Sequence, residues 1–205
     1  MGDGSTVPEE RRRQILQAAV RAFARKGFHA CRVSDIAAEA GVAYGLVYHY
    51  FGSKEALLET IFRETWGAML DTISSVEQLD EPASEQVRKV TEIVLRTWKR
   101  DPDLVRLLVR EVTRSQQLEH ETDEIELAFD ALQRIIERGQ RNGEFRSDLE
   151  PRLAATIWYG ALEEVLTAWA LGQLPDGLDD VAGAERVVVE MVAGGLTAER
   201  AAAPA

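Results

Sequence analysis

The chain has 205 residues, which is enough for one or two small domains. Hydrophobic residues make up 45% and charged residues 29%, the balance of an ordinary soluble globular protein rather than a disordered one. The single cysteine, Cys31, excludes a disulfide framework and indicates a reducing compartment. No signal peptide precedes Arg11 and no uncharged run reaches the roughly 18 residues of a membrane span, so we expect a cytoplasmic protein with no membrane partner.

The net charge of −11 argues against a nucleic-acid partner when it is taken over the whole chain. The charge is distributed unevenly, however. Residues 1–55 carry a small excess of basic side chains, and the remainder carries all of the acidic excess. A mildly basic head on an acidic body would orient the molecule in the electric field of DNA, although an acidic body also serves solubility alone.

The first predicted helix runs from about Pro8 to Lys26. Pro8 suits a first turn, the acidic residues that follow it suit the helix dipole, and Lys26-Gly27 is a good stop. Its apolar stripe would pack against the elements that follow and complete a three-helix domain.

Residues 32–58 predict two short helices joined by a tight turn and followed by a third helix. Ser34 is expected to cap the first of these, which would run from Asp35 to Ala40. Gly41 falls where the chain must turn, because only glycine accepts a positive φ without strain. The next helix would open at Val42 or Ala43 and end near Tyr50.

The spacing of Ala37, Gly41 and Val47 is the specific part of this stretch. In a helix-turn-helix the two helices cross closely, so the first needs a small residue at the crossing and the turn needs glycine. The second helix needs a β-branched side chain that packs on its inner face. Helical spacing turns Leu46, Val47 and Tyr50 inward. The outward face would hold two tyrosines, a glycine and a histidine with no acidic residue, and it suits a DNA major groove, whereas an ordinary helical hairpin is the plainer alternative.

The run from about Arg11 to Leu58 resembles the DNA-binding domain of the tetracycline-repressor (TetR) family. The resemblance is carried by Ile15-Leu16, Ala18-Ala19, Phe23-Ala24, Gly27-Phe28, Val33-Ser34, Ile36-Ala37, Ala40-Gly41-Val42, Val47-Tyr48-His49-Tyr50-Phe51 and Ser53-Lys54-Glu55. Farther along, Gly143-Glu144-Phe145-Arg146 and Asp148 are similar to a loop in many members. The resemblance implies an all-α protein with a helix-turn-helix DNA-binding domain at residues 1–52 and a ligand-binding and dimerisation domain at 53–205.

Contacts to DNA should divide into those that position the protein and those that read bases. For positioning we expect Ser34, Tyr48 and Lys54, with Arg32 and His49 as weaker candidates. Lys54 would oppose the dipole of the helix it opens, and a docked phosphate would remove that conflict. For reading we expect Ala43, Tyr44 and Gly45, although this stretch lacks the small hydroxyl residues common in the family.

Apolar stripes predict the remaining helices. A fourth helix should run from Ser53 to about Leu79 and could act as a lever, a fifth should cover about Ser84 to Arg100, and a sixth should start with Leu104, Leu107, Leu108 and Val112. A seventh should run from about His120 to Arg141.

The last two predicted helices, Leu153–Leu171 and Val187–Leu196, carry very few charges. A helix that is apolar on more than one side is buried on more than one side, so we expect a four-helix bundle between two copies of the chain. The expected interface residues are Ile157, Ala161, Val165, Trp169, Val188, Val192 and Leu196.

The resemblance also implies a ligand cavity among the fourth to eighth helices, although core packing is the plainer interpretation of any one aromatic residue there. The expected lining residues are Trp66, Met69, Leu70, Trp98, Leu107, Phe129, Leu132, Trp158, Tyr159 and Leu162. Such a cavity would suit a hydrophobic or amphipathic small-molecule effector, with a fatty acyl-CoA, as in FadR-like relatives, as an alternative.

An enzyme is the main rival class. The scattered His29, His49 and His120 build no metal cluster, and no phosphate loop or nucleophile motif is present, so we expect no catalysis, metal or cofactor. A helical adaptor without a DNA role would leave the outward face of residues 44–49 unexplained. The sequence therefore predicts a ligand-responsive homodimeric transcriptional repressor with about nine helices, which binds a near-palindromic operator and is released by its effector.

Overall fold

The computed structural model describes residues 7–111 and 122–197, and within these ranges the chain forms nine helices and no strand. The chain divides into two compact units. Unit 1 comprises Met1–Thr65 with Asp101–Glu121, and unit 2 comprises Trp66–Arg100 with Thr122–Ala205. The expected all-α class and the number of helices are confirmed. Val112 and His120, at the ends of two expected helices, lie outside the described residues.

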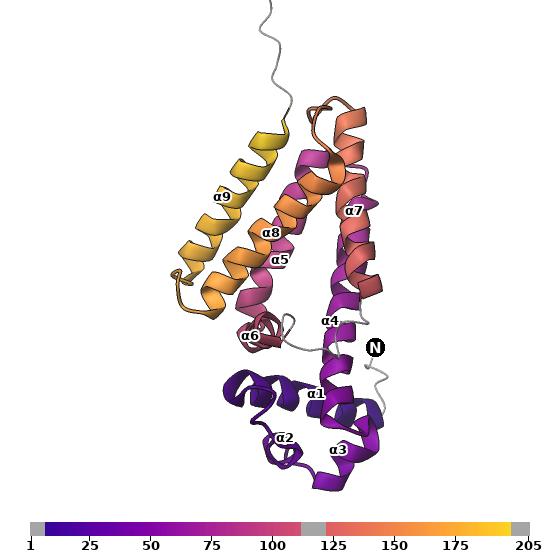
Figure 1. The fold of residues 1–205 in the computed structure, drawn as a ribbon, viewed down its shortest axis with the longest axis vertical. Helices are drawn as coiled ribbons and strands as arrows, with labels where there is room; N and C mark the ends of the chain where they lie inside the picture. Colours follow the sequence, from indigo (N-terminus) through magenta and orange to yellow (C-terminus); the bar gives the residue numbers. More distant parts are fainter. Residues whose placement is uncertain (1–6, 112–121, 198–205) are drawn as a thin grey trace, which may run out of the picture. The chain divides into compact units, whose positions relative to one another are not determined.

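Unit 1 holds α1 (Val7–Lys26), α2 (Val33–Ala40), α3 (Tyr44–Phe51), the first half of α4 (Lys54–Glu77) and α6 (Pro102–Glu111). Within this unit α1 packs on both α2 and α6 (Figure 1). The core of unit 1 is formed by the apolar faces of all five helices, and its most deeply buried side chains include Ile15, Phe23, Ile36, Val47, Leu57 and Leu107. Burial of each such side chain stabilises the fold by roughly 1.5–3 kcal/mol. The inward faces of the helices thus supply the stability, and the residues on the outward faces are not needed for it.

The turn between α2 and α3 has the geometry that the spacing predicted. Gly41 takes φ 63° and ψ 35°, in the left-handed region, and its amide donates to the carbonyls at the end of α2. Ala37 and Val47 are both buried in the core. On α3 the four outward residues are exposed, as expected.

The predicted cap of α2 is wrong by two residues. The helix begins at Val33, and Arg32 is the capping position with an extended backbone, so Ser34 lies inside the first turn. The Asp35 carboxylate accepts a hydrogen bond from the Arg32 amide at 3.0 Å and takes the role expected of Ser34. Ser53 does cap a helix, because its hydroxyl accepts from the Ala56 amide at 2.9 Å at the start of α4.

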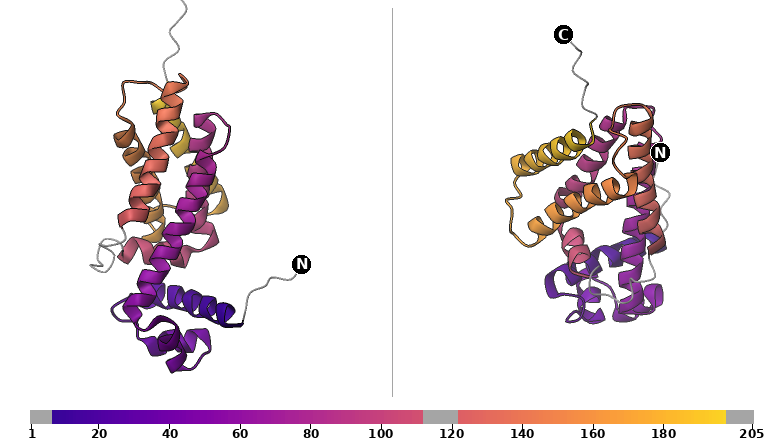
Figure 2. Two further views of the ribbon diagram at one scale, coloured as in Figure 1. Left: turned by 90° about the vertical axis from the view of Figure 1, so that its right-hand side faces the viewer. Right: turned by 45° about the horizontal axis from the view of Figure 1, so that its top comes forward.

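Unit 2 holds the second half of α4 with α5 (Ala83–Arg100), α7 (Thr122–Arg141), α8 (Pro151–Ala170) and α9 (Leu178–Leu196). Both views in Figure 2 show α8 beside α7, and α9 packs on α5 and, less extensively, on α8. The last helix begins nine residues before the expected Val187. Its first turn is closed by the Asp180 carboxylate, which accepts from the Gly177 amide at 3.0 Å.

The loop between α7 and α8 fixes the start of α5. The Glu144 carboxylate accepts from the amides of Ala83 and Ser84 at 3.1 and 3.2 Å and so caps that helix. Phe145 is buried directly over Gly139, where a methyl group would come within 2.2 Å of its ring. The loop motif that the resemblance singled out thus has a structural role within unit 2.

Candidate functional site

A polar hollow of about 460 Å³ opens on unit 1 at the exposed side of α3. It is lined by His29, Cys31, Arg32, Val33, Ser34, Tyr44, Tyr48, Ser53, Lys54 and Glu55. Residues from the first turns of both α2 and α4 line it, and the first amides of a helix have no partner within the helix. The positive ends of two helix dipoles therefore meet at this hollow, which we call the unit 1 hollow.

The unit 1 hollow brings together five of the eight side chains that the sequence predicted as DNA contacts. These five are Arg32, Ser34, Tyr44, Tyr48 and Lys54. The other three, Ala43, Gly45 and His49, are exposed on α3 but do not line it. The other lining residues, His29, Cys31, Val33, Ser53 and Glu55, were not predicted, because nothing in the local pattern shows that the loop before α2 folds toward the start of α4.

Lys54 has a role that the sequence did not indicate. Its ammonium donates to the carbonyl oxygens of Phe28 at 2.9 Å and Cys31 at 3.2 Å, and it lies 4.3 Å from the centroid of the Phe28 ring. Two carbonyls and an aromatic face offset the unfavourable position of a cation at a helix start. An ammonium has three N–H donors, so one donor remains for a group inside the hollow.

We expect Lys54→Ala to lower the free energy of unfolding of the protein by about 1–2 kcal/mol, because it removes two hydrogen bonds and a cation–π contact. It should also weaken binding to every duplex alike and reduce the salt slope by about one for each subunit, because one cation is removed from each. Lys54→Arg should keep the slope and reduce only stability, since the charge stays while the fork fits the two carbonyls poorly. Unfolding titrations and binding over a salt series measure both effects. Full stability in the alanine variant would show that the contacts of Lys54 with Phe28 and Cys31 do not stabilise the fold. An unchanged salt slope would show that Lys54 does not touch DNA.

Several basic side chains of unit 1 are already paired with carboxylates. Arg21 and Arg25 both donate to Glu39, at 2.9 and 2.8 Å, and Lys26 lies 2.8 Å from Asp35. Hydrogen bonds from the two arginines lower the pKa of Glu39, and the hydrogen bond from Lys26 lowers the pKa of Asp35. Both carboxylates therefore stay ionised at neutral pH and neutralise these cations.

Arg32 differs from those cations. It is exposed at the mouth of the unit 1 hollow, at the start of α2. Within the described part of the chain, no carboxylate lies within 4.0 Å of its guanidinium. A guanidinium that makes no ion pair within 4.0 Å and lies beside two helix starts is suited to a phosphate oxygen.

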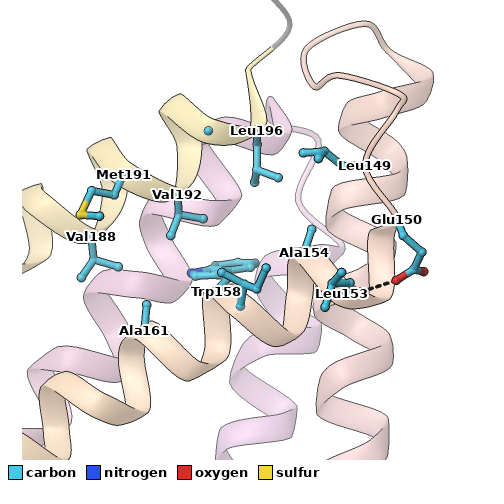
Figure 3. Close-up of a pocket in the computed structure, with 12 residues that line it drawn as sticks. Leu149, Glu150, Leu153, Ala154, Trp158, Ala161, Val188, Met191, Val192 and Leu196 are labelled. Atoms are coloured by element: carbon cyan, nitrogen blue, oxygen red, sulfur yellow. Dashed lines mark hydrogen bonds between the residues drawn. The ribbon is translucent and has the colours of Figure 1, made fainter.

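Most of the predicted interface residues lie on the α8–α9 face of unit 2, where an apolar hollow of about 340 Å³ opens between the two helices. Figure 3 shows Trp158 at its floor, with Val188, Met191 and Val192 projecting from α9. Five predicted interface residues line it: Ile157, Ala161, Val188, Val192 and Leu196. We call this the unit 2 hollow. Of the other two, Val165 is half-buried and Trp169 is buried within the subunit.

The surface around the unit 2 hollow is unusually apolar for an exposed face. Leu153, Ile157, Val187 and Met191 are 58%, 63%, 52% and 73% exposed. All four lie on α8 or α9. An apolar face of this kind in one subunit is typical of a surface that another protein covers.

The predicted effector-lining residues do not form one group. Three of them meet in unit 2, where the Tyr159 ring lies 4.8 Å from Phe129 and 6.2 Å from Trp66. Burial, and then the nearby Glu163 carboxylate, raise the pKa of Tyr159, so this phenol stays neutral. Met69 and Leu70 are half-buried, and Leu132 and Leu162 are buried in the same unit.

The other three predicted lining residues are placed differently. Trp98 packs on Trp169 at 6.2 Å and donates to the Asp176 carboxylate at 3.1 Å. Trp158 donates to the Thr91 hydroxyl at 3.0 Å beneath the unit 2 hollow. Leu107 is buried in the core of unit 1.

Two family models match the chain. One, described as bacterial regulatory proteins of the tetR family, matches residues 15–61, and the other, described as the C-terminal region of YsiA-like proteins, matches residues 62–192. The chain belongs to the TetR family of transcriptional regulators. The resemblance that residues 15–55 suggested is thereby confirmed, and it extends over most of the chain.

Individual relatives agree with this assignment. The chain is 29% identical over 185 residues to the fatty acid metabolism regulator protein of Bacillus subtilis, covering 89% of this chain and 94% of that protein. It is 30% identical over 188 residues to the regulator BetI of Vibrio campbellii, covering 84% and 86%. Among solved structures, FadR from Bacillus subtilis in complex with stearoyl-CoA is 27% identical with a TM-score of 0.78, covering 90% of this chain and 98% of that one.

Both of these curated relatives are named as regulators. Among the described residues, no group of three or more His, Cys, Asp or Glu side chains is arranged to hold a metal ion. None of the helices in the ranges that the structure describes combines the length and apolarity needed to cross a membrane.

Proposed function

We propose that this TetR-family regulator is a cytoplasmic homodimeric repressor that places α3 in the major groove at each half of a near-palindromic operator. The exposed face of α3 supports the proposal, because it offers two tyrosines, a histidine and the bare backbone of Gly45 with no acidic side chain. A major groove admits such a helix, and close backbone approach at Gly45 would let neighbouring side chains reach base edges.

The unit 1 hollow gives this proposal its strongest support. Two helix starts, the exposed Arg32 guanidinium and one remaining donor of Lys54 meet there beside the outward face of α3. These are the groups that bind a phosphate, and phosphate contacts fix the register of a protein on a duplex. The proposal ranks Arg32 first among the positioning residues, above Ser34, whose hydroxyl carries no charge.

We expect Arg32→Ala to weaken binding about tenfold to a hundredfold for each subunit on every duplex that the protein binds, because a charge-assisted phosphate contact is worth about 1.5–3 kcal/mol. The slope of log affinity against log salt should fall by about one for each subunit in which the guanidinium is removed. Arg63→Ala is the matched control, since Arg63 is an exposed cation of unit 1 that does not line the hollow. Equal weakening in the two variants would show that only overall charge matters.

The dimer part of the proposal is supported by the apolar α8–α9 face. Two copies of this face, related by a two-fold axis, would make a four-helix bundle and cover the exposed side chains of both subunits. Family members typically act as dimers, and a dimer matches the two halves of a near-palindromic site.

We propose a hydrophobic or amphipathic effector that binds unit 2. The aromatic group of Trp66, Phe129 and Tyr159 and its neutral phenol support an apolar ligand. A fatty acyl-CoA is the alternative with a named precedent, because the similar FadR structure contains stearoyl-CoA. The helix α4 contributes residues to both units, so an effector that favours one position of α4 would change the affinity of unit 1 for DNA.

Selection of duplexes from a random library by the full-length chain tests the DNA-binding function. A recovered near-palindrome with two half-sites about one helical turn apart is the expected result. Native mass spectrometry of the purified chain, followed by titration of the protein–operator complex with acyl-CoAs of increasing length and with free CoA, tests the effector. A chain that enriches no duplex would contradict the repressor and favour a helical adaptor. Release by no acyl-CoA would reject only the alternative ligand.

A further inference from the structure

Two tyrosines on the outward face of α3 are joined to each other. The hydroxyl oxygens of Tyr44 and Tyr48 lie 3.0 Å apart, and their ring centroids lie 5.1 Å apart with the planes inclined by 59°. Both side chains are exposed, Tyr44 at 52% and Tyr48 at 42%, and both line the unit 1 hollow. The spacing of four residues brings them onto adjacent turns of the helix.

The number of O–H groups in this pair limits how many hydrogen bonds it can donate to a ligand. Each phenol has one O–H donor, and one of the two is used inside the pair. One outgoing donor therefore remains for a group in the hollow. In a chain of two hydroxyls, each hydrogen bond polarises the next, so the outgoing donor is stronger than that of an isolated phenol.

The direction of the hydrogen bond indicates which hydroxyl faces a ligand, because the Tyr44 O–H donates to the Tyr48 oxygen and the Tyr48 O–H remains for a further acceptor. Tyr48 is close enough to Glu55, in the first turn of α4, to be affected by its charge. The first turn of α4 is one of the two helix starts that end in the hollow. Glu55 is the acidic side chain that lines the hollow, and Arg32 and Lys54, which also line it, offset its charge. A phosphate oxygen at this point would lie within reach of Tyr48.

We propose that Tyr44 and Tyr48 bind operator DNA as one unit, in which Tyr44 donates to Tyr48 and Tyr48 donates to a backbone phosphate. Tyr44 is then a positioning residue that holds and polarises Tyr48, and it does not read a base. This inference rests on the proposed function, because it requires α3 to lie against DNA. It assigns to Tyr44 a role different from the base contact that its place at the start of α3 predicted.

A double-variant cycle on a duplex selected by the wild-type chain tests the pair. Tyr48→Phe should weaken binding about tenfold, because a hydrogen bond to a charged group is removed. Tyr44→Phe should weaken it about threefold to tenfold through Tyr48 alone. The double variant should then bind within about twofold of Tyr48→Phe, because the two hydroxyls act in one chain. The salt slope and the selected sequence should stay unchanged in all three, since no cation and no base contact is removed.

Tyr50→Phe is the matched control, because Tyr50 lies on the same helix but packs against the core of unit 1. Independent effects that multiply in the double variant would overturn the pair, and so would a changed base preference in Tyr44→Phe. If the wild-type chain selects no duplex, the proposed function fails and the DNA role of the pair fails with it. Titration of the Tyr48 ring carbon by NMR in the free protein tests the pairing without DNA: Tyr44→Phe should shift the pKa of Tyr48, and an unchanged pKa would disprove the hydrogen bond.

Discussion

Replacing Met191 with glutamate should make the protein monomeric and weaken its binding to a two-half-site operator by about 10²–10⁴-fold. Met191 is 73% exposed and projects over the unit 2 hollow, so its replacement leaves the subunit core intact. In a two-fold bundle of α8 and α9, however, the carboxylate would be buried without a partner. The same carboxylate of the second subunit would also repel it. The second half-site would then no longer be held near the first, which removes the gain from bivalent binding.

Sedimentation velocity gives the subunit number of this variant, and binding to operators with one and two half-sites gives the affinity. Affinity for a single half-site should stay within about twofold of wild type, because unit 1 is untouched. Leu127→Glu is the matched control, since Leu127 is 51% exposed on α7 and does not line the hollow. A Met191→Glu chain that remains dimeric would show that subunits associate through another surface.

Trp158→Ala should lower the free energy of unfolding by about 3–5 kcal/mol, the cost typical of a large aromatic residue removed from a core. Trp158 has no exposed surface and forms the floor of the unit 2 hollow. Its indole N–H donates to the Thr91 hydroxyl at 3.0 Å, and Thr91 is also fully buried. The substitution therefore leaves a cavity and an unpaired polar group together.

A two-step substitution separates these two costs. Trp158→Phe keeps an aromatic ring but strands the Thr91 hydroxyl, and adding Thr91→Val should recover about 1–3 kcal/mol because both partners are then apolar. Trp169→Phe is the control, since its N–H donates to the carbonyl of the exposed Pro175, where water can replace it. Equilibrium unfolding in denaturant measures all four variants. No recovery in the double variant would show that packing alone sets the cost.

The sequence predicted the helix-turn-helix well because its determinants are local. Ala37, Gly41 and Val47 lie within eleven residues, and each has a role that only a few residue types can fill. The capping of α2 was mispredicted because Ser34 and Asp35 are both good caps and a shift of one or two residues exchanges their roles. The choice depends on where the chain enters the helix, and that is fixed by the packing of Cys31 and Val33 in the core.

Contacts between distant segments could not be predicted from pattern alone. The acceptors of Lys54 lie 26 and 23 residues away, and Thr91 lies 67 residues from Trp158. Helical periodicity shows which face of a helix is buried but does not identify its partner. For the same reason the aromatic residues of the body were grouped as one cavity lining, whereas the structure divides them among several separate contacts.

The internal pairing of Arg21, Arg25 and Lys26 also affects how the protein would find its target in a cell. Cations that are ion-paired with Glu39 and Asp35 contribute little to the attraction between the protein and DNA of any sequence. The net charge of −11 adds a repulsion from bulk DNA. Fewer molecules would then be sequestered on the chromosome at any moment. Since occupancy of a regulatory site depends on the ratio of specific to competing sites, a low copy number would suffice to keep the operator occupied.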